Sequence, residues 1–269
     1  MSIKDILVYS DNDEHCRNRL LSATRWAEMF GAHLAAFYAK RYVTIPSYAG
    51  MSLPVEVYEA NDELTLNLCE TVGSMVTEVG KSADIDIEFR AVEGALGDNL
   101  SIFSRYSDLL IVPRHYSDDR LNENYQLSSV LIGSTCPVLM MANNTRNTLP
   151  IKNVLLAWDG GHECARVLRA VLQMFDALEK IDIVAVDSDG VEASDIALHI
   201  ARHGISTEVH LPASAGENVG ARILDQAQVL GSDLVAMGAY GHSRLLELIF
   251  GGTCKYVIEN AEVPILFSH

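Results

Sequence analysis

A glycine-rich stretch in the last third of the chain carries the clearest chemical pattern. Gly238 and Gly241 follow a short apolar run, and Gly251 and Gly252 precede a segment with helical periodicity. Glycine lets a backbone turn tightly and approach a ligand without a Cβ in the way. The free N–H groups at the start of a helix also favour an anion. Two such turns after one strand could cradle a chain of phosphates, but an ordinary turn and a helix entry explain the glycines equally well.

Other candidates for chemistry are weaker. The motifs GxxxxGK[ST], GxGxxG and GxSxG do not occur, so P-loop hydrolysis, ordinary dinucleotide binding and the hydrolase elbow lack their signatures. His199 and His203 are spaced like two zinc ligands on a helix, but nothing nearby completes the set, which favours a solvated helix face. Cys164 recurs at a helical interval with Val167 and Val171, which favours a core thiol over a nucleophile.

Charge and cysteine content restrict the partners. The formal net charge is −16, with 12 Lys and Arg against 20 Asp and Glu up to Pro150, and 8 against 16 after it. A negative field of this size argues against nucleic acid and anionic membrane as partners. The five cysteines include no CxxC, the N-terminus enters a strand-like run directly, and no apolar run approaches the roughly 20 residues that span a bilayer. We therefore expect a cytoplasmic protein.

The chain repeats itself once, at a period too long for a solenoid. Residues 4–11 match 152–159, and three later matches keep their order: 97–100 with 216–219, 108–110 with 233–235, and 136–139 with 263–266. A polar stretch closed by Pro150 lies between the halves. We predict one domain over residues 1–145 and a second over residues 151–269.

Short apolar runs alternate with helical periodicity in both halves. In the second half the predicted strands are Ile151–Ala157, Ile181–Val186, Ser206–Leu211, Asp233–Met237 and Pro264–Phe267, and the predicted helices include Asp195–His203, Glu217–Leu230 and Thr253–Asn260. Such alternation predicts an α/β fold: two tandem doubly wound domains, each with a mostly parallel five-stranded sheet. Ligands in these sheets bind beyond the carboxyl ends of the strands, where the strand order reverses. In the first half, Lys40–Leu64 reads as a long connection.

The glycine pattern resembles a known signature. Gly238-x-x-Gly241, nine residues, then Gly251 and a small residue is similar to the ATP-binding motif of the universal stress protein family. Asp159-Gly160-Gly161 is similar to the Val-Asp-Gly-Ser corner after that family's first strand. The resemblance covers nearly the whole chain as a tandem form. It implies an adenine nucleotide alpha hydrolase-like fold and a stress-response protein that binds ATP or ADP, with Mg²⁺ as a companion ion, in its second domain.

The resemblance also implies roles for individual residues. It places Asp159 near adenine or ribose, Val186 against the base, Met237, Gly238, Tyr240 and Gly241 along the ribose and first phosphate, and Gly251, Gly252 and Thr253 at the outer phosphates. One departure concerns Gly252, which stands where the family usually has Ser or Thr, so that Thr253 would have to supply the hydroxyl. Losing one hydrogen bond to a phosphate weakens affinity about ten- to a hundredfold.

The first half departs further from the signature. Pro113 and Tyr116 stand where Gly238 and Gly241 align. Proline removes an N–H, and neither residue tolerates the backbone geometry that glycine supplies. We predict that the first half binds no nucleotide in the family's manner.

Three functions remain open at this point. The first is a regulatory module that binds an adenine nucleotide and acts on an unidentified protein partner. The second is a slow ATPase or phosphoryl-transfer enzyme, with Asp159 aiding a metal ion and Arg244 or Lys255 neutralising charge. The third is a scaffold without nucleotide. In each case we expect the last strands of the two halves to meet in an intramolecular pseudo-dimer, and such chains to pair again as homodimers.

Overall fold

The computed structural model describes residues 3–40, 55–114, 129–141, 149–186, 191–210, 218–239 and 252–269. Its strands are β1 (Asp5–Tyr9), β2 (His33–Lys40), β3 (Ile87–Glu93), β4 (Leu109–Pro113), β5 (Val138–Met141), β6 (Asn153–Trp158), β7 (Lys180–Ala185), β8 (Ser206–His210), β9 (Leu234–Gly238) and β10 (Ile265–Ser268). Its labelled helices are α1 (Cys16–Phe30), α2 (Val55–Ala83), α3 (Leu96–Ser104), α5 (His162–Met174), α6 (Val191–Arg202), α7 (Val219–Val229) and α8 (Gly252–Asn260).

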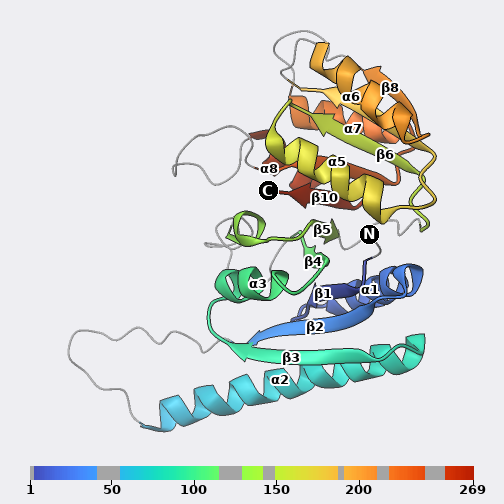
Figure 1. The fold of residues 1–269 in the computed structure, drawn as a ribbon. Coiled ribbons are helices and arrows are strands. Elements are labelled where there is room, and N and C mark those ends of the chain that lie inside the picture. The colour runs from blue at the N-terminus through green and yellow to red at the C-terminus, as the bar shows by residue number, and fades with distance from the viewer. Residues whose placement is uncertain are drawn as a thin grey trace, which may run out of the picture.

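All the strands join in one sheet of ten, in the order β3-β2-β1-β4-β5-β10-β9-β6-β7-β8. The sheet runs from β3 at the bottom of Figure 1 to β8 at the top. Within each half every strand pair is parallel. Read from its outer edge inward, the second half (β8-β7-β6-β9-β10) has the same strand order as the first (β3-β2-β1-β4-β5). The predicted α/β fold with mostly parallel strands is therefore confirmed.

The two halves meet through their last strands. Strands β5 and β10 pair antiparallel, with Leu266 opposite Leu139. The predicted contact between the last strands is confirmed, and it makes the two five-stranded sheets continuous. The division of the chain at residues 145 and 151 stays a prediction, because the residues around it lie partly outside the described ranges.

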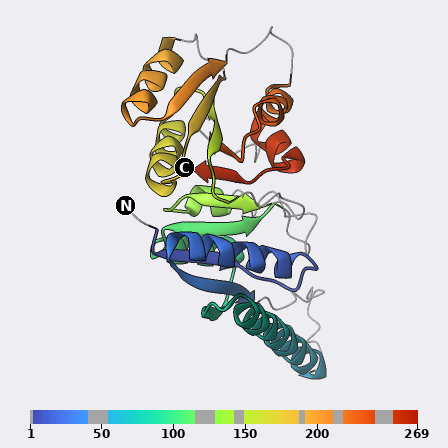
Figure 2. The same cartoon turned by 90° about the vertical axis from the view of Figure 1, so that its right-hand side faces the viewer.

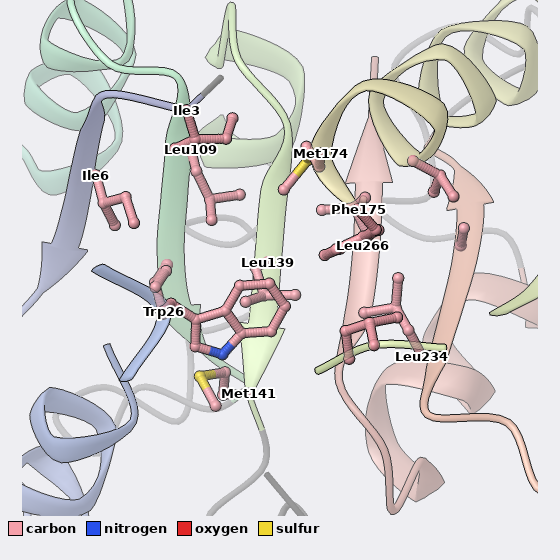
Figure 3. Close-up of a cluster of buried hydrophobic side chains, with 14 of the residues drawn as sticks. Ile3, Ile6, Trp26, Leu109, Leu139, Met141, Met174, Phe175, Leu234 and Leu266 are labelled. Carbon is pink, nitrogen blue, oxygen red and sulfur yellow. The ribbon is translucent and has the colours of Figure 1, made fainter. Parts of the chain in front are cut away.

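Two apolar layers cover the sheet. Helices α1, α2, α5 and α6 pack on one face, and α3, α7 and α8 pack on the other (Figures 1 and 2). Neighbouring strand residues alternate between the layers, as Leu155 and Leu156 do. Figure 3 shows that the first layer continues across the junction of the halves, where Trp26 of α1 lies 5.9 Å from Phe175, which follows α5, between ring centroids. The halves therefore share one core.

Two helices begin earlier than predicted. The connection expected over Lys40–Leu64 ends earlier, because α2 already begins at Val55. Residues 55–60 and 62–64 are exposed, so this part of the helix carries no buried stripe that marks it in the sequence. Helix α2 packs on the sheet only further along, through Val72, Val76 and Val79. Helix α6 likewise begins at Val191, four residues before the predicted start at Asp195.

Candidate functional site

The strand order of the second half reverses between β6 and β9. From β6 the chain builds β7 and β8 on one side, and then returns to place β9 and β10 on the other. A crevice beyond the carboxyl ends of two such strands is the usual ligand site of an open parallel sheet. Here those ends are Trp158 of β6 and Gly238 of β9, and they pair side by side through Ala157 and Met237.

Two helix N-termini converge on Gly238. A Cβ built on Gly238 would lie 2.9 Å from the backbone nitrogen of Cys164 and 2.9 Å from Cβ of Glu163, both in the first turn of α5. The Cys254 thiol, in the first turn of α8, lies 3.9 Å from the Gly238 carbonyl oxygen, to which it donates. The site at the switch point is therefore framed by the starts of α5 and α8.

The close packing gives Gly238 a structural role. It needs glycine because any Cβ would collide with the backbone of α5, whatever ligand is present. Gly252 differs, since a Cβ there would meet nothing within 4 Å. The two glycines of one sequence pattern therefore have different requirements.

A matched pair of substitutions tests this difference. We expect Gly238→Ala to lower the free energy of unfolding by about 1–3 kcal/mol, the usual cost of overpacking a core. Gly252→Ala should leave it unchanged or slightly raised, because alanine fits the start of a helix. Chemical denaturation of both variants measures the two values. Equal values for the two variants would contradict the packing role of Gly238.

Asp159 directly follows β6, and Cys164 lies in the first turn of α5. Oδ1 of Asp159 accepts the N–H of Gly161 at 2.8 Å, which shapes the turn into α5. The Cys164 thiol donates to the carbonyl oxygen of Ala157 at 3.2 Å. Burial, together with the neighbouring Asp159 carboxylate, raises the pKa of Cys164 to about 12. The thiol therefore stays protonated at neutral pH, and its prediction as a core residue is confirmed.

The other predicted site residues divide into two groups. Val186 directly follows β7, and its N–H donates to Trp158 O at 2.7 Å, so its backbone lies beside the end of β6. The Met237 side chain is buried in the core, and Gly252 and Thr253 form the first turn of α8. Tyr240, Gly241 and Gly251 lie outside the described residues. The roles assigned to all these residues stay predictions.

Two residues near the site were not predicted from the sequence. Gly220 of α7 lies against α8, where a Cβ would be 2.8 Å from Cβ of Tyr256 and 3.0 Å from the Thr253 carbonyl oxygen. Glu163, the second residue of α5, has a buried carboxylate oxygen. The sequence could have indicated Glu163, because it is an acidic residue shortly after Asp159-Gly160-Gly161. Nothing in the sequence marks Gly220 as a contact.

In the first half, the residue equivalent to Asp159 forms a buried ion pair. Asp11 corresponds to Asp159, and its Oδ1 lies 2.7 Å from Nη2 of Arg19. Nε of Arg19 also donates to the Tyr9 carbonyl oxygen at 2.8 Å. Both side chains are buried, so the carboxylate that could face a ligand is already neutralised. This arrangement supports the prediction that the first half binds no nucleotide.

Three residues of types that bind metal ions lie together on β7 and β8. Ligand atoms of Asp182, Glu208 and His210 lie within 4.8 Å of one another. The ammonium group of Lys180 lies 2.8 Å from the Asp182 carboxylate and 3.4 Å from that of Glu208. Because a lysine already supplies the positive charge, the group is an internal ion-pair network on β7 and β8.

Within the described ranges, every helix is too short or too polar to cross a bilayer.

Comparison with known proteins agrees with this fold. Residues 203–269 match the model of the universal stress protein family. A universal stress protein of Synechocystis is 28% identical over 123 residues, which are 43% of this chain and 42% of that protein. The matched region thus spans less than half of this relative.

Solved structures match over almost the full length. A universal stress protein from Archaeoglobus fulgidus has a TM-score of 0.69 at 18% identity, covering 97% of this chain and 95% of its own. A putative universal stress protein from Pseudomonas aeruginosa has a TM-score of 0.56 at 16% identity, covering 98% and 92%. These structures agree in fold, and the family model and the Synechocystis relative agree in sequence. The chain therefore has the fold of solved universal stress proteins, its residues 203–269 match the sequence model of that family, and its length of 269 residues fits the tandem form.

Proposed function

We propose that the second half binds an adenine nucleotide, ATP or ADP, in the crevice between β6 and β9, and that this binding serves regulation in a stress response. The observation that carries the proposal is the convergence of two helix N-termini on Gly238 at the switch point. A helix N-terminus offers free N–H groups and a positive dipole end to an anion.

The starts of α5 and α8 carry different charges, and this difference would orient a bound nucleotide. The start of α5 holds the carboxylates of Asp159 and Glu163, which repel phosphate. The first turn of α8 holds no acidic residue, Gly252 is exposed, and Thr253 is half-buried. The phosphates therefore belong at α8, and the neutral parts of the nucleotide belong at α5.

Binding, without dedicated catalysis, is the function that the described residues support. A Mg²⁺ ion that accompanies ATP would supply charge neutralisation to the phosphates at α8, whereas Asp159, at the start of α5, would face the neutral parts of the nucleotide. Of the two basic residues considered for phosphoryl transfer, Arg244 lies outside the described ranges, and Nζ of Lys255 lies 3.9 Å from the Glu259 carboxylate. Among the described residues, none favours turnover over binding.

A single added charge tests the proposed phosphate site. Thr253→Asp places a carboxylate at the N-terminus of α8, where it favours the helix dipole but repels phosphate. We expect affinity for Mg-ATP to fall about tenfold or more, and thermal stability to stay equal or rise slightly. Isothermal titration calorimetry with Mg-ATP and Mg-ADP, together with thermal unfolding, measures both.

The control makes the same charge change at the other end of the helix. Asn260→Asp adds a carboxylate at the last residue of α8, away from the crevice. This variant should bind Mg-ATP like the wild type. If Thr253→Asp binds Mg-ATP as tightly as Asn260→Asp, the phosphates do not lie at α8. If the wild-type protein binds neither nucleotide, the proposed function is wrong.

A further inference from the structure

One buried carboxylate oxygen near the crevice has no hydrogen bond from the described residues. It is Oε2 of Glu163, whose side chain is only 15% exposed. The other oxygen, Oε1, lies 4.0 Å from Nη1 of Arg166, at the outer limit of an ion pair. An unpaired buried acceptor carries a substantial free-energy cost, so it points to a missing donor.

Gly161 and Gly238 locate the Glu163 side chain relative to Asp159 and β9. Oε2 lies 3.2 Å from the point where a Cβ of Gly161 would stand, and Oδ1 of Asp159 lies 2.9 Å from the same point. The two oxygens are therefore at most 6.1 Å apart, the sum of those distances. Cβ of Glu163 also touches Gly238, as described above. Glu163 thus lies beside Asp159 and Gly238, at the carboxyl ends of β6 and β9.

The two carboxylates are not equivalent acceptors. Oδ1 of Asp159 already accepts the Gly161 N–H, whereas Oε2 of Glu163 accepts nothing from the described residues. An ionised carboxylate is an acceptor only, so a ligand group that meets it must be a donor and must not be a phosphate. A nucleotide offers two such groups, the ribose hydroxyls and the amino group of adenine.

The strand order selects between these two groups. Strands β9, β6 and β7 are neighbours, and neighbouring strands are about 4.8 Å apart. The start of α8 lies by β9, Glu163 lies between β9 and β6, and Val186 follows β7. A nucleotide with its phosphates at α8 and its base near Val186 would place its ribose in the middle, next to Glu163.

We infer that Glu163 determines specificity for the sugar: its free oxygen accepts a hydrogen bond from a ribose hydroxyl and so favours ribonucleotides over deoxynucleotides. This inference rests on the proposed function. Two acceptor oxygens no more than 6.1 Å apart suit the vicinal diol of ribose, with Glu163 as the unused acceptor.

The test compares ATP with 2′-deoxy-ATP and 3′-deoxy-ATP by calorimetric titration of the full chain. We expect the wild type to bind ATP about tenfold or more tightly than at least one deoxy analogue, since a hydrogen bond to a charged acceptor is lost. Glu163→Met removes the acceptor at similar volume, and should bring this ratio close to one by weakening ATP alone. Glu163→Gln, which keeps a neutral acceptor, should retain part of the preference.

Glu179→Gln is the control, because it removes a charge from an exposed residue of the same half. It should keep the wild-type ratio. A wild type that does not discriminate, or a Glu163→Met variant that keeps the full ratio, overturns the inference while the proposed function stands. If Glu163→Met does not fold, the ratio of Glu163→Gln decides, and an unchanged ratio overturns the inference. A wild type that binds no nucleotide overturns both.

Discussion

Replacing Asp11 with asparagine is expected to lower the free energy of unfolding by about 3–5 kcal/mol, the usual effect of removing one partner of a buried ion pair. The side chains of Arg19 and Asp11 are only 4% and 10% exposed. Burial by itself lowers the pKa of Arg19, but the charge and hydrogen bond of Asp11, together with Cys16 and Tyr9, raise that pKa above its ordinary value. The variant would therefore leave a charged guanidinium buried without its counter-ion.

The repeat supplies the control for this experiment. Asp159 is the equivalent residue of the second half, where its described hydrogen bond is the one to Gly161, and Val167 stands at the position of Arg19. Asp159→Asn should therefore cost about 1 kcal/mol or less. The double variant Asp11→Asn with Arg19→Val should recover most of the lost stability, because it leaves no unpaired charge. Urea denaturation of the four proteins measures these values, and equal losses for Asp11→Asn and Asp159→Asn would show that the ion pair does not stabilise the first half.

Gly252→Ser is expected to raise affinity for Mg-ATP about tenfold or more. The substitution restores a hydroxyl where the resemblance to the family places one, at the start of α8. The structure has room for it, because a Cβ on Gly252 meets nothing within 4 Å. A hydroxyl at this point would donate a hydrogen bond to a charged phosphate oxygen, which is one of the stronger kinds.

Gly252→Ala separates the hydroxyl from the added methyl group. Alanine changes the backbone freedom of the same residue but supplies no donor, so its affinity should equal that of the wild type. Calorimetric titration with Mg-ATP compares the three proteins. If serine and alanine have the same effect on affinity, the phosphates do not reach the first turn of α8.

The sequence predicts the fold well because the fold is repeated and its strands are buried. Runs such as Leu234–Met237 are apolar throughout, as strands of a covered parallel sheet must be, and both halves carry the same order of elements. The start of α2 could not be predicted in this way. Its first residues lie in solvent, and an exposed helix shows no apolar stripe.

The site is only partly predictable from the sequence. The pattern predicts Asp159, Gly238 and Gly252 at one edge of one sheet, and the structure brings Asp159, Gly238 and Cys254 in the first turn of α8 to the ends of β6 and β9. It does not show that Gly238 is required by packing on α5, because that contact joins segments more than 70 residues apart along the chain. The sequence also does not predict the ion pair of Asp11 and Arg19, because a charged arginine is not expected at a buried position of a helix.

The central claim is that the second half holds an adenine nucleotide with its phosphates at α8. It is tested most directly by the small molecules that leave the purified protein when it is denatured, identified by mass spectrometry for the wild type and for Thr253→Asp. The latter is preferred to any variant of Gly238, because substitution of Gly238 also disturbs α5. ATP, ADP or AMP released by the wild type, and absent from Thr253→Asp, is the result that we predict. Release of the same nucleotide by both proteins, or of none by the wild type even after incubation with Mg-ATP, would contradict the claim.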